Sequence, residues 1–155
     1  MSVTPTVRVQ AKDFDPQAEA DLLTAGRRDV GALVNFTGLC RDESGTLEAL
    51  ELEHYPGMAE AELSRIAEEA VGRWPLTGLT LIHRFGKIPP GEQIVLVIAA
   101  SSHRRAAFEA ADFLMDYLKT RAPFWKKEHL VSGSKGSWVE AKSEDDADAD
   151  RWSIG

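Results

Sequence analysis

Several features that often define a protein class are scarce or missing in this 155-residue sequence. Its single cysteine, Cys40, excludes an intramolecular disulfide and fits a reducing compartment. No stretch approaches the roughly 20 apolar residues that a membrane-spanning helix needs. The first residues show no basic-then-apolar pattern of a secretory signal. We therefore predict a soluble, cytoplasmic protein with no membrane partner.

A surplus of positive charge is also missing. The formal net charge is −7, whereas proteins that neutralise nucleic-acid phosphates need an excess of lysine and arginine. We therefore expect no nucleic-acid partner. The charge is uneven, because residues 119–135 hold five cations and one anion, while residues 144–150 hold five carboxylates and no cation. A locally basic region in an acidic protein favours a small anionic ligand.

What is present predicts one α+β domain over residues 1–142, followed by an acidic, solvated tail over residues 143–155. Apolar residues make up 43% of the chain, which is enough for a core that needs neither a disulfide nor a metal. We expect a mixed or antiparallel sheet with two main helices packed on it. Strands are predicted at residues 6–14, 32–38, 47–55, 79–85, 93–100 and 136–141, and helices at residues 15–26, 58–74 and 104–119.

The last of these helices has a clear apolar stripe. The stripe is predicted to be buried, with Asp116 among the residues on the outer face. It consists of Ala107, Phe108, Ala111, Leu114, Met115 and Leu118. The strand at residues 93–100 is nearly all apolar and should be central, with both of its faces covered.

Positive charge gathers at the start of helix 104–119. Ser101 or Ser102 is a candidate N-cap, and His103, Arg104 and Arg105 follow. Cations at the positive end of a helix dipole oppose stability but suit a bound anion, which would meet backbone N–H groups and guanidinium groups together. The other interpretation is that these arginines pair with nearby carboxylates or point into water.

Two lysines flank the Ala-Pro-Phe-Trp segment that ends this helix. Lys119 complements the dipole of the last helical turn, and most lysines in that position have no further role. Lys126 follows a segment that predicts a rigid aromatic turn. A lysine that is partly desolvated near other cations has a lowered pKa and can transfer protons near neutral pH. Together, Lys119 and Lys126 indicate a proton-handling, anion-binding site.

Other chemistries find less support. The four histidines lack the spacing of metal ligands, so we expect no metal site and no cofactor. Cys40 is more typical of a small hydrophobic residue than of a nucleophile, although Arg41 follows it. A Schiff base on Lys119 stays possible for a carbonyl substrate, but no other residue favours carbanion chemistry.

Longer segments carry a family resemblance. In order, they are "VNFTGLCRD", "LELEHYPGMAE", "RWPL", "IHRFGKIPPGE", "SSHRRAAFEAADFLMDYLKTRAPFWKKE" and "WVEA". They resemble the large, catalytic subunit of molybdopterin synthase, the MoaE family, from about residue 32 to residue 142. The resemblance implies an α/β hammerhead-like fold.

The resemblance also implies a reaction and partners. Cyclic pyranopterin monophosphate would be converted to the dithiolene of molybdopterin in two successive sulfur transfers. The sulfur would come from the C-terminal Gly-Gly thiocarboxylate of a small, ubiquitin-like sulfur-carrier subunit. The expected assembly is a homodimer of the large subunit within a heterotetramer.

Residue by residue, the resemblance assigns roles to the cations described above. Arg41 and Arg104 would bind the substrate phosphate, and His103 would bind it or orient the pterin. Lys119 would lie beside the thiocarboxylate carbon, and Lys126 would assist on the substrate side. Lys142, where the family usually has an arginine, would reach the site from the partner chain of the dimer. The alternative is a non-catalytic adaptor whose cations only dock the tail of a ubiquitin-like partner.

Overall fold

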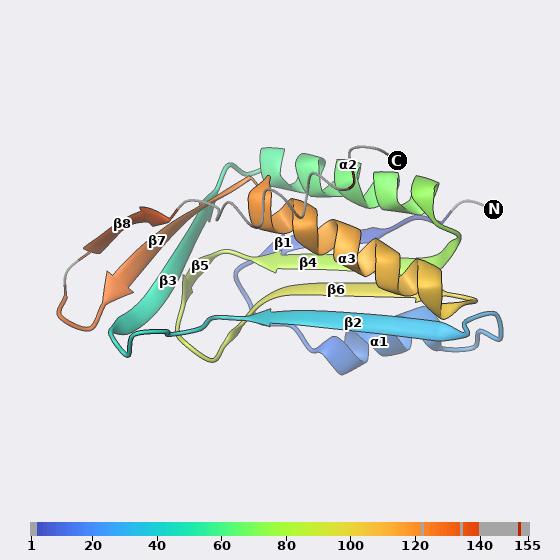
Figure 1. The fold of residues 1–155 in the computed structure, drawn as a ribbon, viewed down its shortest axis with the longest axis horizontal. Helices are drawn as coiled ribbons and strands as arrows, with labels where there is room; N and C mark the ends of the chain where they lie inside the picture. The colour runs from blue at the N-terminus through green and yellow to red at the C-terminus, as the bar shows by residue number, and fades with distance from the viewer. Residues whose placement is uncertain (1–2, 122, 134, 140–151, 153–155) are drawn as a thin grey trace.

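The computed structural model describes residues 3–121, 123–133, 135–139 and 152. Its elements follow in the order β1 (Thr6–Gln10), α1 (Pro16–Thr24), β2 (Ala32–Leu39), β3 (Leu47–His54), α2 (Met58–Arg73), β4 (Leu76–Arg84), β5 (Gly86–Ile88), β6 (Gln93–Ser101), α3 (Arg104–Thr120), β7 (Phe124–Leu130) and β8 (Lys135–Val139). Figure 1 shows one sheet lying between helices and a second group of strands beyond one end of it.

The first sheet has the strand order β1-β4-β6-β2. β1 runs parallel to β4, and β6 pairs antiparallel with both β4 and β2. On one face, Leu63 of α2 and Leu114 of α3 pack into a common core with Val97 of β6. On the other face, Ala20 of α1 packs with Leu96 of β6. The prediction that this apolar strand is central and covered on both faces is therefore confirmed (Figure 1).

The buried face of α3 differs from the predicted stripe at its edges. The alanines and leucines of the stripe are buried, whereas Phe108 is 59% exposed. Asp116, which is expected to face solvent, is only 9% exposed. Its carboxylate accepts a hydrogen bond from the indole N–H of Trp152, a partner that a buried carboxylate requires. The buried face is thus rotated away from Phe108 and towards Asp116.

The second sheet has the order β5-β3-β7-β8. The sequence predicts a rigid turn at Ala-Pro-Phe-Trp, but β7 begins at Phe124, directly after Pro123. Proline is tolerated at the edge of a strand, where its missing N–H removes no ladder hydrogen bond. β7 pairs antiparallel with β3 and places Lys126 opposite Leu52. Four consecutive residues of β7 are Lys-Lys-Glu-His. The strand therefore lacks the alternation of apolar and polar residues from which a strand is predicted.

The α+β fold class is confirmed, with two sheets and with helices packed on the first of them. The division into a domain over residues 1–142 and an acidic tail over residues 143–155 stays a prediction. The acidic run at residues 144–150 lies outside the described residues, and Trp152 alone is described beyond residue 139.

A close contact between the chain before β2 and the start of α3 fixes where that helix begins. The N–H of Gly31 donates to the carbonyl oxygen of Ser101 at 2.9 Å. The hydroxyl of Ser102 donates to the carbonyl oxygen of Asp29 at 3.0 Å. A side chain at Gly31 would clash with the backbone carbonyl of Ser102. Glycine at this position therefore allows the approach that sets the first residues of α3.

We predict that Gly31→Ala lowers the free energy of unfolding by about 1–3 kcal/mol, because the added methyl group must displace the backbone of Ser102. Gly72→Ala is the matched control. Gly72 lies in α2 with open space around its Cα, so the same change should raise stability by up to about 1 kcal/mol. Urea unfolding of both variants measures the difference, and equal stabilities would contradict the prediction.

Candidate functional site

Two of the predicted lysines meet at one pocket. Lys119 lies in the last turn of α3 and Lys126 on β7, and both line a pocket of about 670 Å³. Arg41, from the loop after β2, lines the same pocket. Lys119 is exposed, whereas Lys126 is half-buried. The fold thus gathers three predicted cations from a loop, a helix end and a strand; we call this the lysine pocket.

The two lysines also line a smaller recess of about 60 Å³, called here the inner recess. Side chains alternate along β7, so Phe124 and Lys126 lie on the same face of the strand. Most of the recess wall is apolar, with Leu52 of β3 and Leu118 of α3 among its residues. A charge that develops against this mostly apolar wall is poorly solvated, so a nearby ammonium group acts on it more strongly than it would in bulk water.

Arg41 is paired within its own loop. Its guanidinium forms an ion pair with the carboxylate of Glu43, and the two side chains are 72% and 63% exposed. Asp42, between them, accepts a hydrogen bond from the N–H of Gly45 at 2.9 Å. Exposed ion pairs contribute little to stability. An anion in the lysine pocket can therefore draw Arg41 away from Glu43 with little loss of stability.

The cations at the start of α3 lie elsewhere. His103 and Arg104 are exposed and line a separate pocket of about 390 Å³ together with Arg105 and Phe108. α3 is one continuous helix of 17 residues, and it rises about 22 Å between Arg104 and Lys119. The expectation that these arginines and the lysines form one cluster is therefore not met within a single chain.

α3 also begins without the side-chain cap that the sequence predicts. The N-cap residue is His103, which makes no capping hydrogen bond through its side chain. The hydroxyl of Ser101 donates instead to the carbonyl oxygen of Pro75 at 2.8 Å, and Ser102 bonds to the chain before β2. Arg105 pairs with Glu109 at 3.7 Å. The backbone N–H groups of the uncapped first turn, next to Arg104, can still bind an anion.

Lys142 and Cys40 are the remaining positions in the sequence that are candidates for the site. Lys142 lies outside the described residues. Cys40 is 4% exposed and packs with Leu52 and Ile88. Burial raises the pKa of its thiol, and the carboxylates of Asp42 and Glu92 act in the same direction. Cys40 is therefore a small hydrophobic residue in the wall of the lysine pocket, as its sequence context indicates.

His83 belongs to the inner recess, which its spacing from the other histidines does not predict. It lies on β4, is 5% exposed and lines the recess beside both lysines. Its ring stacks on that of Phe124, with centroids 3.9 Å apart and planes inclined by 13°. Burial is the main cause that lowers the pKa of its imidazole from 6.5 to about 4, and the charges of Lys126 and Lys119 act in the same direction. The available signal is a histidine that directly follows the apolar pair Leu81 and Ile82.

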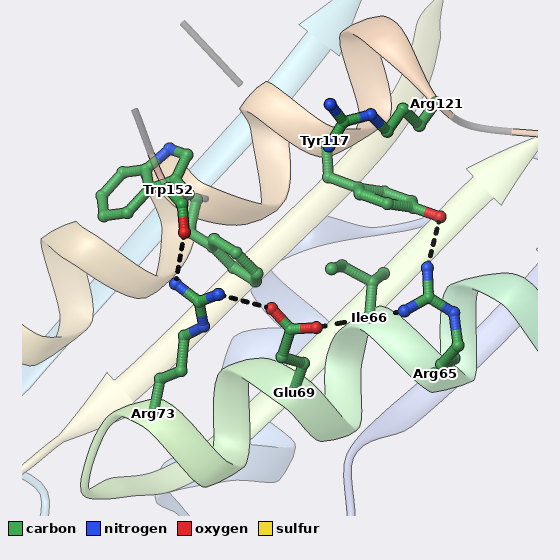
Figure 2. Close-up of a pocket in the computed structure, with 8 residues that line it drawn as sticks. Arg65, Ile66, Glu69, Arg73, Tyr117, Arg121 and Trp152 are labelled. Carbon is green, nitrogen blue, oxygen red and sulfur yellow. Dashed lines mark hydrogen bonds and ion pairs between the residues drawn. The ribbon is translucent and has the colours of Figure 1, made fainter. Parts of the chain in front are cut away.

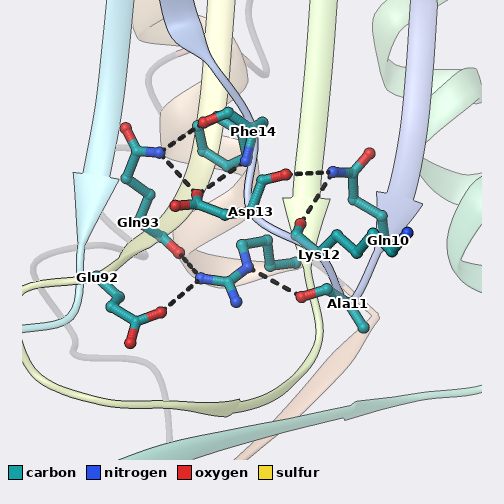
Figure 3. Close-up of polar contacts among 8 residues, drawn as sticks. Gln10, Ala11, Lys12, Asp13, Phe14, Glu92 and Gln93 are labelled. Carbon is teal, nitrogen blue, oxygen red and sulfur yellow. Dashed lines mark hydrogen bonds and ion pairs between the residues drawn. The ribbon is translucent and has the colours of Figure 1, made fainter.

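The backbone beside His83 is held firmly. Nδ1 of His83 lies 2.8 Å from the carbonyl oxygen of Arg84. The Arg84 side chain donates to the carbonyl oxygens of Ala11 at 3.1 Å and Gln93 at 2.8 Å. The Gln93 amide donates in turn to the carboxylate of Asp13 at 2.7 Å; Figure 3 shows these contacts between the segment after β1 and the start of β6. This network fixes the end of β4 and hence the position of His83.

A further pocket, of about 270 Å³, lies between α2 and α3 and contains none of the predicted site residues. Arg65 donates to the hydroxyl of Tyr117 at 2.8 Å. Arg73 pairs with Glu69 at 2.8 Å and donates to the backbone oxygen of Trp152 at 3.1 Å. Figure 2 shows these contacts running from one helix to the other. They join the helices and Trp152 to one another, so we assign this pocket to packing.

The fold and the lysine pocket define an α+β protein with a cationic site beside an apolar recess. The profile of the family described as MoaE protein matches residues 9–121, and the chain belongs to this family. A molybdopterin synthase catalytic subunit from Mesorhizobium japonicum is 71% identical over 150 residues, which cover 97% of this chain and 94% of that protein.

Solved structures agree with this assignment. The molybdopterin biosynthesis MoaE protein from Burkholderia ambifaria has a TM-score of 0.82 and 47% identity, and the match covers 97% of this chain and 99% of that one. A chain from the complex of subunits 1 and 2 of molybdopterin-converting factor from Helicobacter pylori shares the fold, with a TM-score of 0.69 at 20% identity, over 86% of this chain and 88% of that one.

Two further findings concern the described residues alone. Their helices are all too short or too polar to cross a membrane. No group of three or more His, Cys, Asp or Glu side chains among them could hold a metal ion.

We predict that His83 makes the fold sensitive to acid between about pH 6.5 and pH 4. Its folded-state pKa of about 4 lies below the ordinary value of 6.5, so the unfolded chain binds more protons in this range. Stability is then lost as the pH falls through it, by roughly 3 kcal/mol at most. His83→Phe removes the titrating group and keeps an aromatic ring. Urea unfolding at pH 7 and pH 5 should show a smaller loss in this variant than in the wild type; equal losses would contradict the prediction.

Proposed function

We propose that this chain is the catalytic subunit of a molybdopterin synthase. It takes sulfur from the thiocarboxylated C-terminal Gly-Gly of a small, ubiquitin-like subunit and transfers it to cyclic pyranopterin monophosphate, in two steps, to make the dithiolene of molybdopterin. The observation that carries the proposal is the convergence of Lys119 and Lys126 on one pocket. The name of the 71% identical relative supports it, and the reaction fits the cytoplasmic location that the sequence predicts.

The inner recess suits the end of the small subunit. Glycine residues carry no side chain, so an extended Gly-Gly tail can enter a narrow, mostly apolar space. Its terminal thiocarboxylate is an anion, which the cations of the lysine pocket attract. Lys119 lies beside the thiocarboxylate carbon, stabilises the negative charge that develops there and transfers protons. Lys126 assists on the substrate side.

The substrate phosphate needs donors of its own. Arg41 lines the outer part of the lysine pocket and is held there only by its exposed pair with Glu43. A phosphate can accept two parallel hydrogen bonds from the guanidinium, as a carboxylate can, and the exposed pair with Glu43 is weak enough to be exchanged for it. We assign Arg41 to the phosphate on this basis.

His103 and Arg104 can join this site only from a second chain, because α3 holds them about 22 Å from Lys119. We infer a homodimer in which the start of α3 in one protomer completes the lysine pocket of its partner. Lys142 enters from the partner in the same way. Exposed apolar side chains support such an interface, with Leu33 and Phe36 each 39% exposed and Phe108 59% exposed. The first two lie on β2, an edge strand that can accept a neighbour.

The small subunit completes the assembly as a heterotetramer. A protein of the same fold forms a complex of subunits 1 and 2 of molybdopterin-converting factor, and by analogy one small subunit binds each large subunit here. This arrangement gives each lysine pocket its own tail.

We predict that Lys119→Met lowers turnover at least about 100-fold, because it removes the group that stabilises charge in the transition state. The assay is formation of molybdopterin from cyclic pyranopterin monophosphate with the thiocarboxylated small subunit. Lys87→Met, at an exposed position of β5, is the matched control and should leave turnover unchanged. Binding of the small subunit should persist in both variants. Normal turnover by Lys119→Met would instead favour the adaptor function.

We predict that chains carrying Lys119→Met and Arg104→Ala restore activity when they are mixed, although each is inactive alone. In a mixed dimer, one site combines the intact Lys119 of one chain with the intact Arg104 of the other. The second site combines the two substituted positions and is inactive. Random mixing of symmetric dimers should therefore recover about one quarter of the active sites. Unfolding and refolding the two chains together, followed by the turnover assay, measures this fraction. No recovery in verified mixed dimers would place Arg104 outside the shared site.

A further inference from the structure

The side chains that line the inner recess include cations but few groups that can accept a hydrogen bond. Ammonium groups only donate, and a methionine sulfur accepts weakly. Among the side chains that line the recess, Lys119, Lys126 and His83 are the ones with nitrogen or oxygen atoms. His83 is therefore the side chain that can offer a strong acceptor to this space.

The orientation of the His83 ring decides which nitrogen is the acceptor. Nδ1 lies 2.8 Å from the carbonyl oxygen of Arg84. A carbonyl oxygen only accepts, so Nδ1 carries the proton and Nε2 keeps its lone pair. Stacking on Phe124 at 3.9 Å fixes the plane of the ring. Nε2 has no hydrogen-bond partner in the described part of the chain, which leaves its lone pair to a group in the recess.

Strand geometry brings Lys126 to the same place. Phe124 and Lys126 are two residues apart on β7, so their side chains point to one face of the strand. Because Phe124 stacks on His83, Lys126 leaves the strand on the face that carries this contact, and its charge acts on the imidazole. Both His83 and Lys126 then reach the wall of the inner recess.

We propose that His83 is a positioning residue for Lys126. When the pocket is occupied, Nε2 of His83 accepts one hydrogen bond from the ammonium group of Lys126. This contact holds the ammonium group in the recess and directs its remaining N–H groups towards the substrate. The assignment of the reaction rests on the proposed function, whereas the contact between the two side chains does not.

The charge state of His83 fits this role. Burial, together with the nearby charges of Lys126, Lys119 and His54, lowers the pKa of the imidazole to about 4. The ring is therefore neutral at physiological pH and accepts a hydrogen bond without repelling the lysines. A carboxylate in the same position would neutralise Lys126, and a protonated imidazole would push it away. A neutral acceptor orients the ammonium group and leaves its charge available.

Two substitutions separate positioning from packing. His83→Phe keeps an aromatic ring for stacking on Phe124 but has no acceptor. His83→Gln places an amide oxygen near the position of Nε2. In single-turnover assays with the thiocarboxylated small subunit, we expect His83→Phe to be about tenfold slower than wild type, the effect of one hydrogen bond to a charged group. His83→Gln should recover most of that loss. His54→Phe, in the same aromatic cluster but outside the recess, should react at the wild-type rate.

A double-mutant cycle tests whether the effect passes through Lys126. In a Lys126→Met background, His83→Phe should slow the reaction less than about twofold, because the positioned group is gone. A tenfold loss that persists in this background would overturn the proposal. So would a His83→Phe enzyme that is folded and as fast as wild type.

If Lys126→Met is too slow to assay, a spectroscopic measurement tests the contact between His83 and Lys126. We would follow the side-chain NMR signals of the lysines in the dimer with the small subunit bound. His83→Phe should shift the ammonium signal of Lys126 and leave that of Lys87, on β5, unchanged. An unchanged Lys126 signal would overturn the proposal. If wild type makes no product while the Lys126 signal still responds, the proposed function fails and the contact stands.

Discussion

The packing of α3 on the first sheet is the constraint on which the site depends. Small buried residues on its inner face, including Ala107 and Ala110, let the helix lie close to β6. The helix therefore acts as a rigid rod whose two ends have fixed positions. The C-terminal end of α3, which carries Lys119, lies beside β7, and its N-terminal end, which begins at Arg104, lies near the start of β2 (Figure 1). The homodimer that we infer follows from this separation.

The parts of the structure that the sequence predicts are those with a regular apolar pattern. The apolar run of β6 identifies a covered strand, and the helix predicted at residues 58–74 is present as α2. β7 could not be predicted in the same way, because its half-buried face carries charged and polar side chains that serve the pocket. The sequence predicts that Phe108 is buried, but it is exposed, because periodicity cannot distinguish a core residue from an exposed one at the edge of a stripe.

The functional site, like the fold, can be predicted from the sequence only in part. Lys119 and Lys126 could be recognised from local charge, and the structure places them on one pocket. Their separation from Arg104 follows from the length of α3, which local charge does not report. The sequence does not predict a role for His83, because that role depends on two contacts. The ring of Phe124 is distant in sequence, and the contact with the carbonyl oxygen of Arg84 is set by the local backbone geometry. Both require the second sheet to be placed against the end of β4.

The unbroken course of α3 has a consequence for how proteins of this fold can vary. Each residue of an α-helix adds about 1.5 Å and turns the chain by roughly 100°. Insertion of one residue between Arg104 and Lys119 would swing one functional end away from its pocket while the other stayed in place. Loops that carry no site residue, such as that around Gly26 between α1 and β2, can change length without this effect. We therefore expect insertions and deletions among relatives to gather in such loops, and the spacing across α3 to stay fixed even where its outward-facing residues differ.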